Sequence, residues 1–550
     1  RGPVLCVMAG GAALATAAVV TAAVVTAAVV TAAQPRVQFT RAQADSGRQL
    51  YAERCASCHG GALNDGEFAP PLRGDATLHQ WSNGTLAMLY SKIHQTMPPS
   101  APGSLTPAEA ATITAYILRE NGFESGDVPL PVDLAALAAT RIPPPTNPLA
   151  GAVSNDVVLK PSPDAVADPF ARFRPVTDAM IGKPDDGDWL TWRRTAEVDG
   201  YSPLKQIDKG NVAGLQLVWS WMLANGPNES TPLVHDGVMF VFAQGRDDNV
   251  QALDAATGEL IWRYVHSLPA GEDIDNKKSL ALYGDTLFFA TSDRKIVAIK
   301  ARTGEKLWDR ELLSASRPEQ RASIVGGPLI ANGRVVTGTT GQQPGGNFVV
   351  GLDPGSGKEL WRFATIPSPG TPGGNSWNGL PQDKRSGASI WNPGSYDPQS
   401  GLVYFGPAPT YDTGPLRDWS SDPKVTNDAL YTNNTIAIDP VTGKLKWHFP
   451  HRVNDQWDMD WAFERQIVDL LVAGKRRRLI VTGGKEAIFD LIDAKTGTYV
   501  RSFDLGLQNF VTAIDPKTGA KTVDPARVPT SDHAVTLCPH AEGGKNWLPN

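Results

Sequence analysis

The phrase Ala252-Leu-Asp-Ala-Ala-Thr-Gly-Glu-Leu-Ile-Trp262 recurs along this chain of 550 residues. Each copy predicts a strand, a tight turn that contains glycine, and a second strand that ends in tryptophan, which is a hairpin of one propeller blade. The step from Trp262 to Trp308 is 46 residues, which is typical of propellers. A β-sandwich with similar turns would not explain the fixed tryptophan. The other copies lie at residues 298–308, 351–361 and 437–447, with shorter forms near Asp493 and Asp515.

The composition agrees with a large β-rich protein. The chain has 53 glycines, 44 prolines and 15 tryptophans, so turns and aromatic packing points are frequent. It is 41% hydrophobic and 20% charged with a net charge of −6, and its length favours two or three domains. No basic run of the chain suggests nucleic acid, so we expect no nucleic-acid partner.

A second pattern, Cys55-Ala-Ser-Cys58-His59, precedes the repeats. Two cysteines at this spacing followed by histidine are typical of c-type haem attachment, although a redox or zinc-binding CxxC turn is the alternative. Both thiols would bind the haem covalently, and His59 would be one axial ligand of the iron. Met97, in Thr96-Met97-Pro98-Pro99, is our candidate for the other axial ligand. The rival ligands are His79, His94 and Met88, of which Met88 fits a helical core.

Helical patterns surround this motif. Residues 46–54 have apolar side chains at helical spacing, and Thr106 with Pro107 predicts the capped start of a helix over residues 108–119. The region resembles class I cytochrome c. A segment rich in proline and alanine follows and predicts a linker that keeps a redox partner close.

The N-terminal segment predicts export. Residues 4–33 lack charge, and Ala42-Gln43-Ala44 offers a cleavage site with small residues. The segment is therefore either a signal peptide or a membrane anchor, and both place the rest of the chain in the periplasm. Because the chain begins with Arg1 and has no closing element before Asn550, we expect sequence to be missing at both ends.

Six phrases outside the repeats are Asp188-Trp-Leu-Thr-Trp192, Tyr201-Ser-Pro-Leu204, Gly394-Ser-Tyr-Asp397, Leu402-Val-Tyr-Phe405, Asn454-Asp-Gln-Trp-Asp458 and Gly543-Gly-Lys-Asn-Trp547. With the repeats, they resemble the quinoprotein alcohol dehydrogenases, eight-bladed propellers that bind pyrroloquinoline quinone. With the cytochrome, the chain resembles a quinohaemoprotein dehydrogenase. The implied fold is an all-β eight-bladed propeller, C-terminally incomplete here, after a small all-α cytochrome c domain. Cys538 would then pair with a cysteine beyond the chain. The expected divisions are a leader at 1–44, a cytochrome domain at 45–125, a linker at 126–170 and a propeller at 171–550.

The resemblance implies a set of site residues. Asp458 matches the catalytic base, and Trp391 matches the indole on which the quinone lies. Lys485 stands where the family has a cation beside the quinone carbonyls. Each residue also has a structural alternative: an acid in a blade turn, a core tryptophan or a surface lysine. Further matched contacts to the cofactor are Glu229, Asn546 and Trp547.

This chain also departs from the family. Asp275-Asn-Lys-Lys278 lacks the vicinal cysteines whose disulfide often covers the quinone. In calcium-dependent members a Glu and an Asn join the catalytic Asp around the ion. The Glu position aligns with Gln343, or with Gln342 if a gap is placed differently, and the Asn position aligns with Pro409. A neutral amide and a proline are poor ligands for a hard cation. Asp460 resembles the extra acid of lanthanide-dependent members, so Asp458 and Asp460 would bind calcium or a lanthanide. Tyr411, Asp412 and Asp418 could replace the lost ligands.

The sequence therefore predicts an exported dehydrogenase that oxidises a small or polymeric alcohol. Electrons would pass through the haem to an external acceptor, either a cytochrome or a membrane oxidase, and residues 4–33 could associate with a membrane. The alternative is a haem-bearing propeller scaffold or electron-transfer protein without enzymatic activity, whose metal site has decayed.

Overall fold

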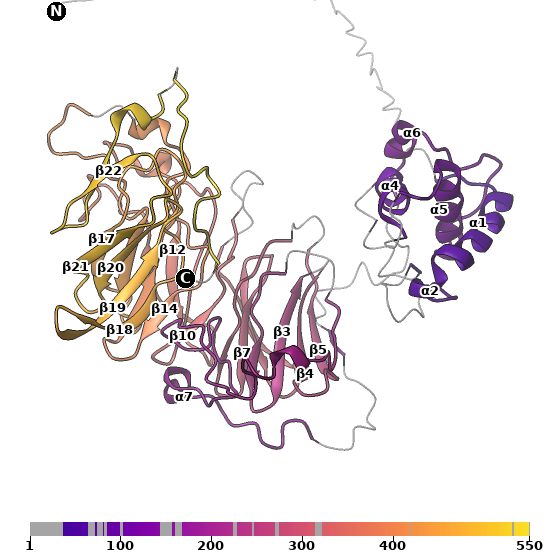
Figure 1. The fold of residues 1–550 in the computed structure, drawn as a ribbon, viewed down its shortest axis with the longest axis horizontal. Helices are drawn as coiled ribbons and strands as arrows, with labels where there is room; N and C mark the ends of the chain where they lie inside the picture. The colour runs from indigo at the N-terminus through magenta and orange to yellow at the C-terminus, as the bar shows by residue number, and fades with distance from the viewer. Residues whose placement is uncertain are drawn as a thin grey trace, which may run out of the picture. The chain divides into compact units, whose positions relative to one another are not determined.

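The computed structural model divides the chain into two units, residues 1–148 and residues 149–550. Figure 1 shows helices in the first unit and mainly strands in the second. The N-terminal segment with residues 4–33 and Cys6 is outside the described residues. The structure describes residues 37–63, 72–73, 81, 85–98, 103–142, 157–159, 168–223, 228–244, 247–269, 274–313, 322–417, 420–530 and 533–548.

The helical unit packs around one apolar core. The helices whose bounds the structure describes are α1 (Arg41–Arg54), α2 (Ala56–His59), α4 (Leu86–Thr96), α5 (Pro107–Glu120) and α6 (Leu134–Ala139). The predicted start of α5 is confirmed, because Thr106 and Glu109 form a capping box around Pro107. Gly47 of α1 lies against the Thr112 carbonyl oxygen and Tyr116 of α5, so a side chain at this position would separate the two helices.

This core extends beyond the segment in which the cytochrome domain was expected. Phe39 is buried within it, and so are Leu130, Leu137 and Ile142. Part of residues 126–142, which we expected in the linker, therefore packs against the helices. The candidate cleavage site Ala42-Gln43-Ala44 lies inside α1. Among the described residues, the structure contains no helix with the length and apolar character needed to cross a membrane.

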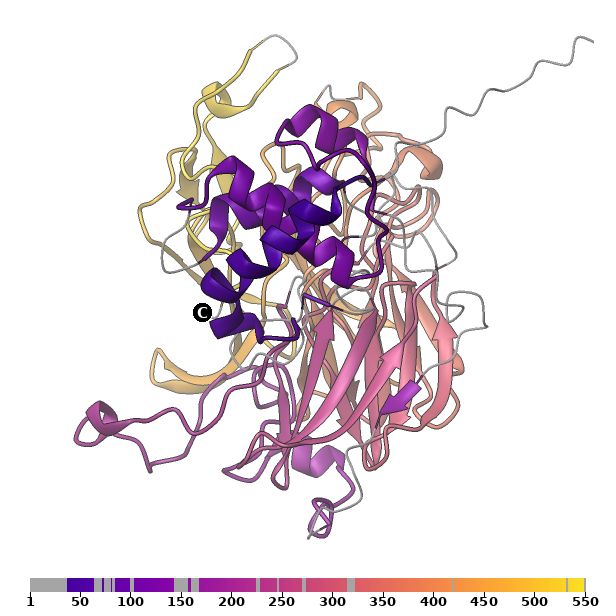
Figure 2. The same cartoon turned by 90° about the vertical axis from the view of Figure 1, so that its right-hand side faces the viewer.

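The second unit is a propeller of antiparallel sheets that follow one another in chain order (Figure 1 and Figure 2). The described part has five sheets of four or five strands and one strand pair, so the number of eight blades stays a prediction. A short helix, α7 (Asp178–Gly182), precedes most of the strands.

The first sheet contains β1 (Val157–Leu159), β2 (Leu233–His235), β3 (Val238–Gln244), β4 (Asp248–Asp254) and β5 (Leu260–His266). The second contains β6 (Ala281–Tyr283), β7 (Thr286–Ala290), β8 (Lys295–Lys300) and β9 (Lys306–Glu311). The third contains β10 (Leu329–Ala331), β11 (Arg334–Gly338), β12 (Phe348–Leu352) and β13 (Glu359–Ala364). The fourth contains β14 (Ser395–Asp397), β15 (Leu402–Phe405), β16 (Asn434–Ile438) and β17 (Leu445–Pro450). The fifth contains β18 (Gln466–Val472), β19 (Lys475–Gly483), β20 (Ile488–Asp493) and β21 (Tyr499–Asp504), and the pair is β22 (Val511–Ile514) with β23 (Lys521–Val523).

The repeated tryptophans connect successive blades. The Trp262 indole N–H donates to the Ala301 carbonyl at 3.0 Å, and Trp308 donates to the Pro354 carbonyl at 3.0 Å, in each case within the turn of the next sheet. The same indole covers the turn glycine of the next blade: Gly357, whose φ is +68°, lies against Trp308. The recurring phrase thus supplies both the tryptophan of one blade and the turn that this tryptophan contacts in the next blade.

Candidate functional site

The expected site residues lie in connections rather than in strands. Glu229 precedes β2, and Trp391 precedes β14. Asp458 and Asp460 lie between β17 and β18, whereas Lys485 lies between β19 and β20. Loops of different blades converge at one end of a propeller, so residues far apart in sequence can form one site there.

Lys485 joins the two acids of the Trp457-Asp-Met-Asp460 turn. Its ammonium lies 3.1 Å from Asp458 Oδ2 and 2.6 Å from Asp460 Oδ2, and it also donates to the Asp458 carbonyl at 3.0 Å. The Asp458 side chain is 56% exposed, whereas those of Asp460 and Lys485 are 8% and 9% exposed. Asp458 is therefore the one of the three that a substrate can reach.

Burial and charge determine the protonation of this cluster. Burial raises the pKa of Asp460 to about 6, although Lys485 opposes the rise. Burial by itself would lower the pKa of Lys485, but Asp460 and Asp458 outweigh it and raise that pKa. At neutral pH the lysine is therefore a cation.

Trp391 is linked to the same cluster. Its indole N–H is 3.4 Å from Asp460 Oδ1, and its ring meets the edge of Phe463 at 5.6 Å between centroids. These two contacts fix the plane of a half-buried indole beside the exposed Asp458. A flat aromatic ligand that stacks on this ring would therefore lie near the carboxylate.

Glu229 contacts the segment that lacks the family's cysteines. Its carboxylate accepts from the Asn276 amide at 2.7 Å and forms an ion pair with Lys278. The Lys278 ammonium is 3.8 Å from the ring centroid of Trp547 and 5.6 Å from that of Trp391. Glu229, Trp547 and Trp391 are thus brought together through a lysine to which the sequence analysis gave no role.

The Asn546 side chain forms its described hydrogen bonds close to its own position in the chain. Its side-chain amide donates to the Glu542 carbonyl at 2.9 Å and accepts from the Trp547 backbone N–H at 2.8 Å. Both bonds lie within its own loop. The loop itself reaches the acid cluster, because the Gly544 N–H donates to the Lys485 carbonyl at 2.8 Å.

Several buried side-chain polar atoms have no hydrogen-bond partner among the described residues. They include both polar atoms of Asn392, Nε and Nη2 of Arg193, and Oγ of Ser230, whereas Glu464 forms an ion pair with Lys545 at 3.6 Å. Buried polar groups are almost always satisfied, so this set fits a site that receives a polar ligand. Arg193 and Glu464 were missed from sequence, although Arg193 directly follows the matched phrase that ends at Trp192.

The expected metal site has fewer suitable donors. The Gln343 amide donates to Asn347 at 3.2 Å, and the Pro409 carbonyl accepts from the Ala388 N–H at 3.2 Å. The Asp412 carboxylate accepts from the Gly414 N–H at 3.3 Å, and burial raises the pKa of Tyr411. Asp418 is outside the described residues. The residues present therefore fit a hard cation poorly.

Among the described residues, one group of three or more acidic, histidine or cysteine side chains has its possible metal-ligand atoms close together, and it lies apart from the expected metal ligands. Asp188, His235 and Asp236 each offer an atom within 4.8 Å of the others. His235 Nδ1 is 2.7 Å from Asp188, and Nε2 is 2.9 Å from the Arg174 carbonyl, while Arg174 also pairs with Asp236. Since every ring nitrogen and carboxylate has a protein partner, this group is a structural brace.

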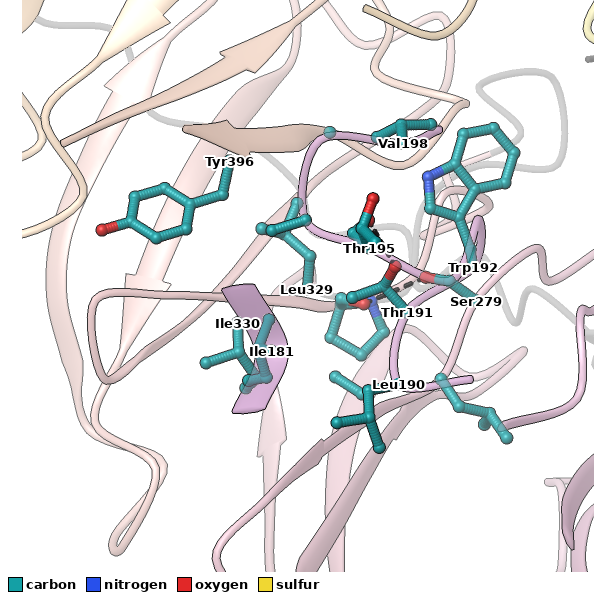
Figure 3. Close-up of a pocket in the computed structure, with 15 residues that line it drawn as sticks. Ile181, Leu190, Thr191, Trp192, Thr195, Val198, Ser279, Leu329, Ile330 and Tyr396 are labelled. Carbon is teal, nitrogen blue, oxygen red and sulfur yellow. Dashed lines mark hydrogen bonds between the residues drawn. The ribbon is translucent and has the colours of Figure 1, made fainter. Parts of the chain in front are cut away.

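Figure 3 shows a small pocket in the propeller unit. Its volume is about 20 Å³, and Ile181, Leu190, Ile330 and Tyr396 are among its lining residues. Such a volume holds about one water molecule. It is therefore a packing gap between blades and not a place for a planar cofactor.

The haem motif lies in the helical unit. Cys55 is half-buried at the junction of α1 and α2, and His59 ends α2; the Cys58 side chain is outside the described set. Met97 directly follows α4. Met88 is 58% exposed, so its expected place in the core is wrong: it lies on the solvent face of α4, opposite Leu89 and Ile93.

Comparisons with known proteins support both units. The model of the family described as glucose/ethanol/alcohol dehydrogenase, beta-propeller domain, matches residues 189–504, which is more than half of the chain. The chain belongs to this family. A second model, described as cytochrome C oxidase, cbb3-type, subunit III, matches residues 42–117.

Relatives of this propeller family include the dehydrogenase subunit of alcohol dehydrogenase (quinone) from Gluconacetobacter polyoxogenes. It is 33% identical over 396 residues, which are 67% of this chain and 51% of the relative. Quinohemoprotein alcohol dehydrogenase ADH IIB from Pseudomonas putida is 31% identical over 381 residues, 66% of this chain and 53% of the relative. The chain thus spans about half the length of the curated relatives it matches.

Solved structures agree. Quinohemoprotein alcohol dehydrogenase ADHIIG from Pseudomonas putida HK5 matches with a TM-score of 0.60 and 29% identity over 68% of this chain and 56% of that chain. A europium-containing methanol dehydrogenase matches with a TM-score of 0.61 and 23% identity, over 68% of this chain and 67% of that one, which supports the fold alone. The propeller fold and the helical cytochrome region expected from the sequence are confirmed.

Proposed function

We propose that this chain is part of an exported quinohaemoprotein dehydrogenase that oxidises an alcohol to a carbonyl compound. The observation that carries the proposal is the exposed Asp458 carboxylate, held by Lys485, whose ammonium also contacts Asp460, the acid at the Trp391 indole N–H. The family membership and the relatives' names support the same activity. The cofactors would be pyrroloquinoline quinone and haem c.

The residues at the site suit removal of a proton and a hydride from an alcohol. Asp458 would accept the hydroxyl proton, because its carboxylate is the exposed acid of the cluster. Lys485 would stabilise negative charge that develops on the acceptor's carbonyl oxygen. Trp391 would support a planar ring, and Glu229, Asn546 and Trp547 would line its edges. Pyrroloquinoline quinone, when bound, supplies a carbonyl carbon that accepts the hydride.

The helical unit would carry the electrons onward. Cys55 and Cys58 would attach the haem, and His59 and Met97 would be its axial ligands. Bound haem c supplies a one-electron carrier, so two successive transfers to an external cytochrome or membrane oxidase would balance each alcohol oxidised. Export to the periplasm and membrane association through residues 4–33 belong to the same proposal.

A calcium or lanthanide ion at Asp458 and Asp460 is a separate proposal, and no step depends on it. The Lys485 ammonium already contacts both carboxylates. Gln343 and Pro409 use their polar atoms elsewhere. The same two positions are the observation that favours the alternative, a haem-bearing scaffold without enzymatic activity.

The test uses full-length protein purified from the exported fraction and followed by haem absorbance. Quinone is added with calcium, with lanthanum or with a chelator, and then a panel of short and polymeric alcohols. We expect alcohol-dependent haem reduction that needs the quinone and that Asp458→Asn abolishes.

The matched control is Asp383→Asn, since this side chain is 70% exposed and remote in sequence from the cluster. Quinone binding without haem reduction by any alcohol, while dithionite still reduces the haem, would support the scaffold instead.

A further inference from the structure

The first hairpin of the fifth sheet is longer than those of the other sheets. Its first strand, β18, has 7 residues, whereas β2, β6, β10 and β14, which hold the same place in the other four sheets, have 3 each. β18 and β19 pair antiparallel as far as Val472 and Lys475 (Figure 1). Ala473 and Gly474 form the turn with φ of +48° and +76°, which is typical of a tight two-residue hairpin turn.

The end of this hairpin projects from the rest of its sheet. β20 pairs with β19 only from Leu479 onward, since Leu479 lies opposite Asp493 at the end of β20. In the first sheet, by contrast, Val238 directly follows the turn and already lies opposite Asp254 at the end of β4. Residues 475–478 of β19 therefore lie beyond the pairing with β20. At ~3.3 Å per residue, the two-stranded end extends by roughly 13 Å.

The projecting end combines apolar and basic side chains. Leu471 is 76% exposed and Leu470 is 39% exposed. Residues 475–478 are four consecutive basic residues, of which Lys475 and Arg476 are exposed, and Arg476 lies directly opposite Leu471 across the hairpin. The end of the hairpin is thus apolar and positive, on a chain whose net charge is −6.

The unbalanced positive charge lies at the tip. The two cations nearer the body of the sheet pair with acids: Arg477 with Asp493 at 3.1 Å, and Arg478 with Asp397, Glu197 and Asp469 at 2.8, 3.1 and 3.2 Å. Asp469 is the one acid in the sequence of the hairpin. Within the part of the chain that the structure describes, the side chains of Lys475 and Arg476 form no ion pair. These two cations are therefore available to an anionic partner.

The shape and chemistry of the tip fit a lipid surface better than a folded protein. A stable protein interface buries about 800 Å² on each partner, whereas this end is a narrow ribbon with few side chains. A bilayer needs no matching surface: leucines enter the acyl boundary while lysine and arginine stay among the headgroups. Basic residues on an open strand edge can also block pairing with another chain, but that role does not explain the exposure of Leu471.

We propose that residues 470–477 form a membrane-contact hairpin, in which the leucines enter the surface of a bilayer that contains anionic lipid and Lys475 and Arg476 contact its headgroups. The inference does not depend on quinone or haem chemistry. β18 begins after Asp460 and ends at this turn, so the hairpin lies at the opposite end of its sheet from the acid cluster. Contact with a membrane would therefore leave the exposed Asp458 open to substrate.

The experiment measures partition of the full-length exported protein onto vesicles by flotation. The vesicles are phosphatidylcholine alone, or equal parts phosphatidylcholine and phosphatidylglycerol. We expect binding to the anionic vesicles that weakens as salt is added. Lys475→Gln with Arg476→Gln should weaken it by about fivefold for each cation removed. Lys384→Gln with Lys424→Gln is the matched control, since it removes the same charge from exposed lysines in connections of other strands and should bind like wild type.

Two further measurements test the apolar contact and its place in the chain. Leu471→Ser should weaken partition onto the same anionic vesicles by about tenfold at unchanged charge. Leu307→Ser, at a leucine of β9 that is 45% exposed, is its control. Hydrogen exchange followed by mass spectrometry should show slower exchange in residues 470–477 with anionic vesicles than with neutral ones.

The outcomes are distinct. If wild-type protein does not bind anionic vesicles, the inference is wrong and an acidic protein is the better occupant. If the protein binds but exchange in residues 470–477 is unchanged, another segment such as residues 4–33 makes the contact. If the Lys475→Gln, Arg476→Gln variant binds vesicles like wild type but self-associates in light scattering, the cations only protect an open strand edge, and the inference is again wrong.

Discussion

The indole contacts between blades can be measured with a matched pair of variants. Trp308 and Trp447 occupy the same position of the recurring phrase, are both half-buried and both cover the turn glycine of the next blade, Gly357 and Gly497. They differ in one respect. The Trp308 N–H donates to the Pro354 carbonyl at 3.0 Å, whereas the buried Trp447 Nε1 has no hydrogen-bond partner.

Replacement by phenylalanine removes a similar ring area from Trp308 and Trp447, but it removes a hydrogen bond only at Trp308. A protein hydrogen bond contributes about 1 kcal/mol net. We therefore expect Trp308→Phe to lower the free energy of unfolding of the propeller by about 1 kcal/mol more than Trp447→Phe does. Since a buried N–H without a partner is costly, the loss at Trp447 should be smaller than ring area alone suggests.

The assay is urea unfolding followed by the remaining tryptophan fluorescence, with haem absorbance reporting the helical unit separately. With a urea dependence of roughly 3 kcal/mol/M or more for a unit of this size, the two midpoints should differ by about 0.3 M or less. Equal midpoints, or a lower midpoint for Trp447→Phe, would refute the assignment of the stability difference to the indole N–H.

Three further predictions concern other parts of the chain. Gly47→Ala should destabilise the helical unit by about 1–3 kcal/mol, because a methyl group would meet the Thr112 carbonyl oxygen; an unchanged helical melting curve by circular dichroism would contradict this packing. Thr106→Ala should cost about 1 kcal/mol in the same melt, since the capping box is lost, and Thr96→Ala on the exposed end of α4 is its control. Burial lowers the pKa of His451 to about 4. Between roughly pH 6.5 and pH 4 the unfolded chain therefore binds a proton at this residue that the folded chain does not bind. The free energy of unfolding falls by at most about 3 kcal/mol as the pH falls through this range. His451→Gln should remove this part of the pH dependence in urea midpoints at pH 7 and pH 5, and an identical pH dependence would show that another group is responsible.

Much of the fold was predictable because its signals are local. The recurring phrase specifies a strand, a turn and a tryptophan within eleven residues, and the resulting blades contact their sequence neighbours. Thr106, Pro107 and Glu109 define the start of α5 by bonds across three residues. These elements could be predicted from one sequence because their patterns repeat and span few residues. The burial of Met88 could not be predicted, since an apolar helical pattern does not say which side of α4 meets the core.

The composition of the site depended on the tertiary structure. Trp391 and Asp460 are 69 residues apart in sequence, and Glu229 and Lys278 are 49 apart. The resemblance identified Asp458, Trp391, Lys485 and Glu229, but each as a separate match.

By itself, the sequence determined the blade repeat, the haem motif and the absence of cysteine at Asp275-Asn-Lys-Lys278. Only the folded chain showed that Lys485 bridges two acids and that Lys278 faces the indoles. The physical reason is that connections from different blades meet at one end of the propeller, so the pairing of charges there follows from the closure of distant loops and not from any local pattern.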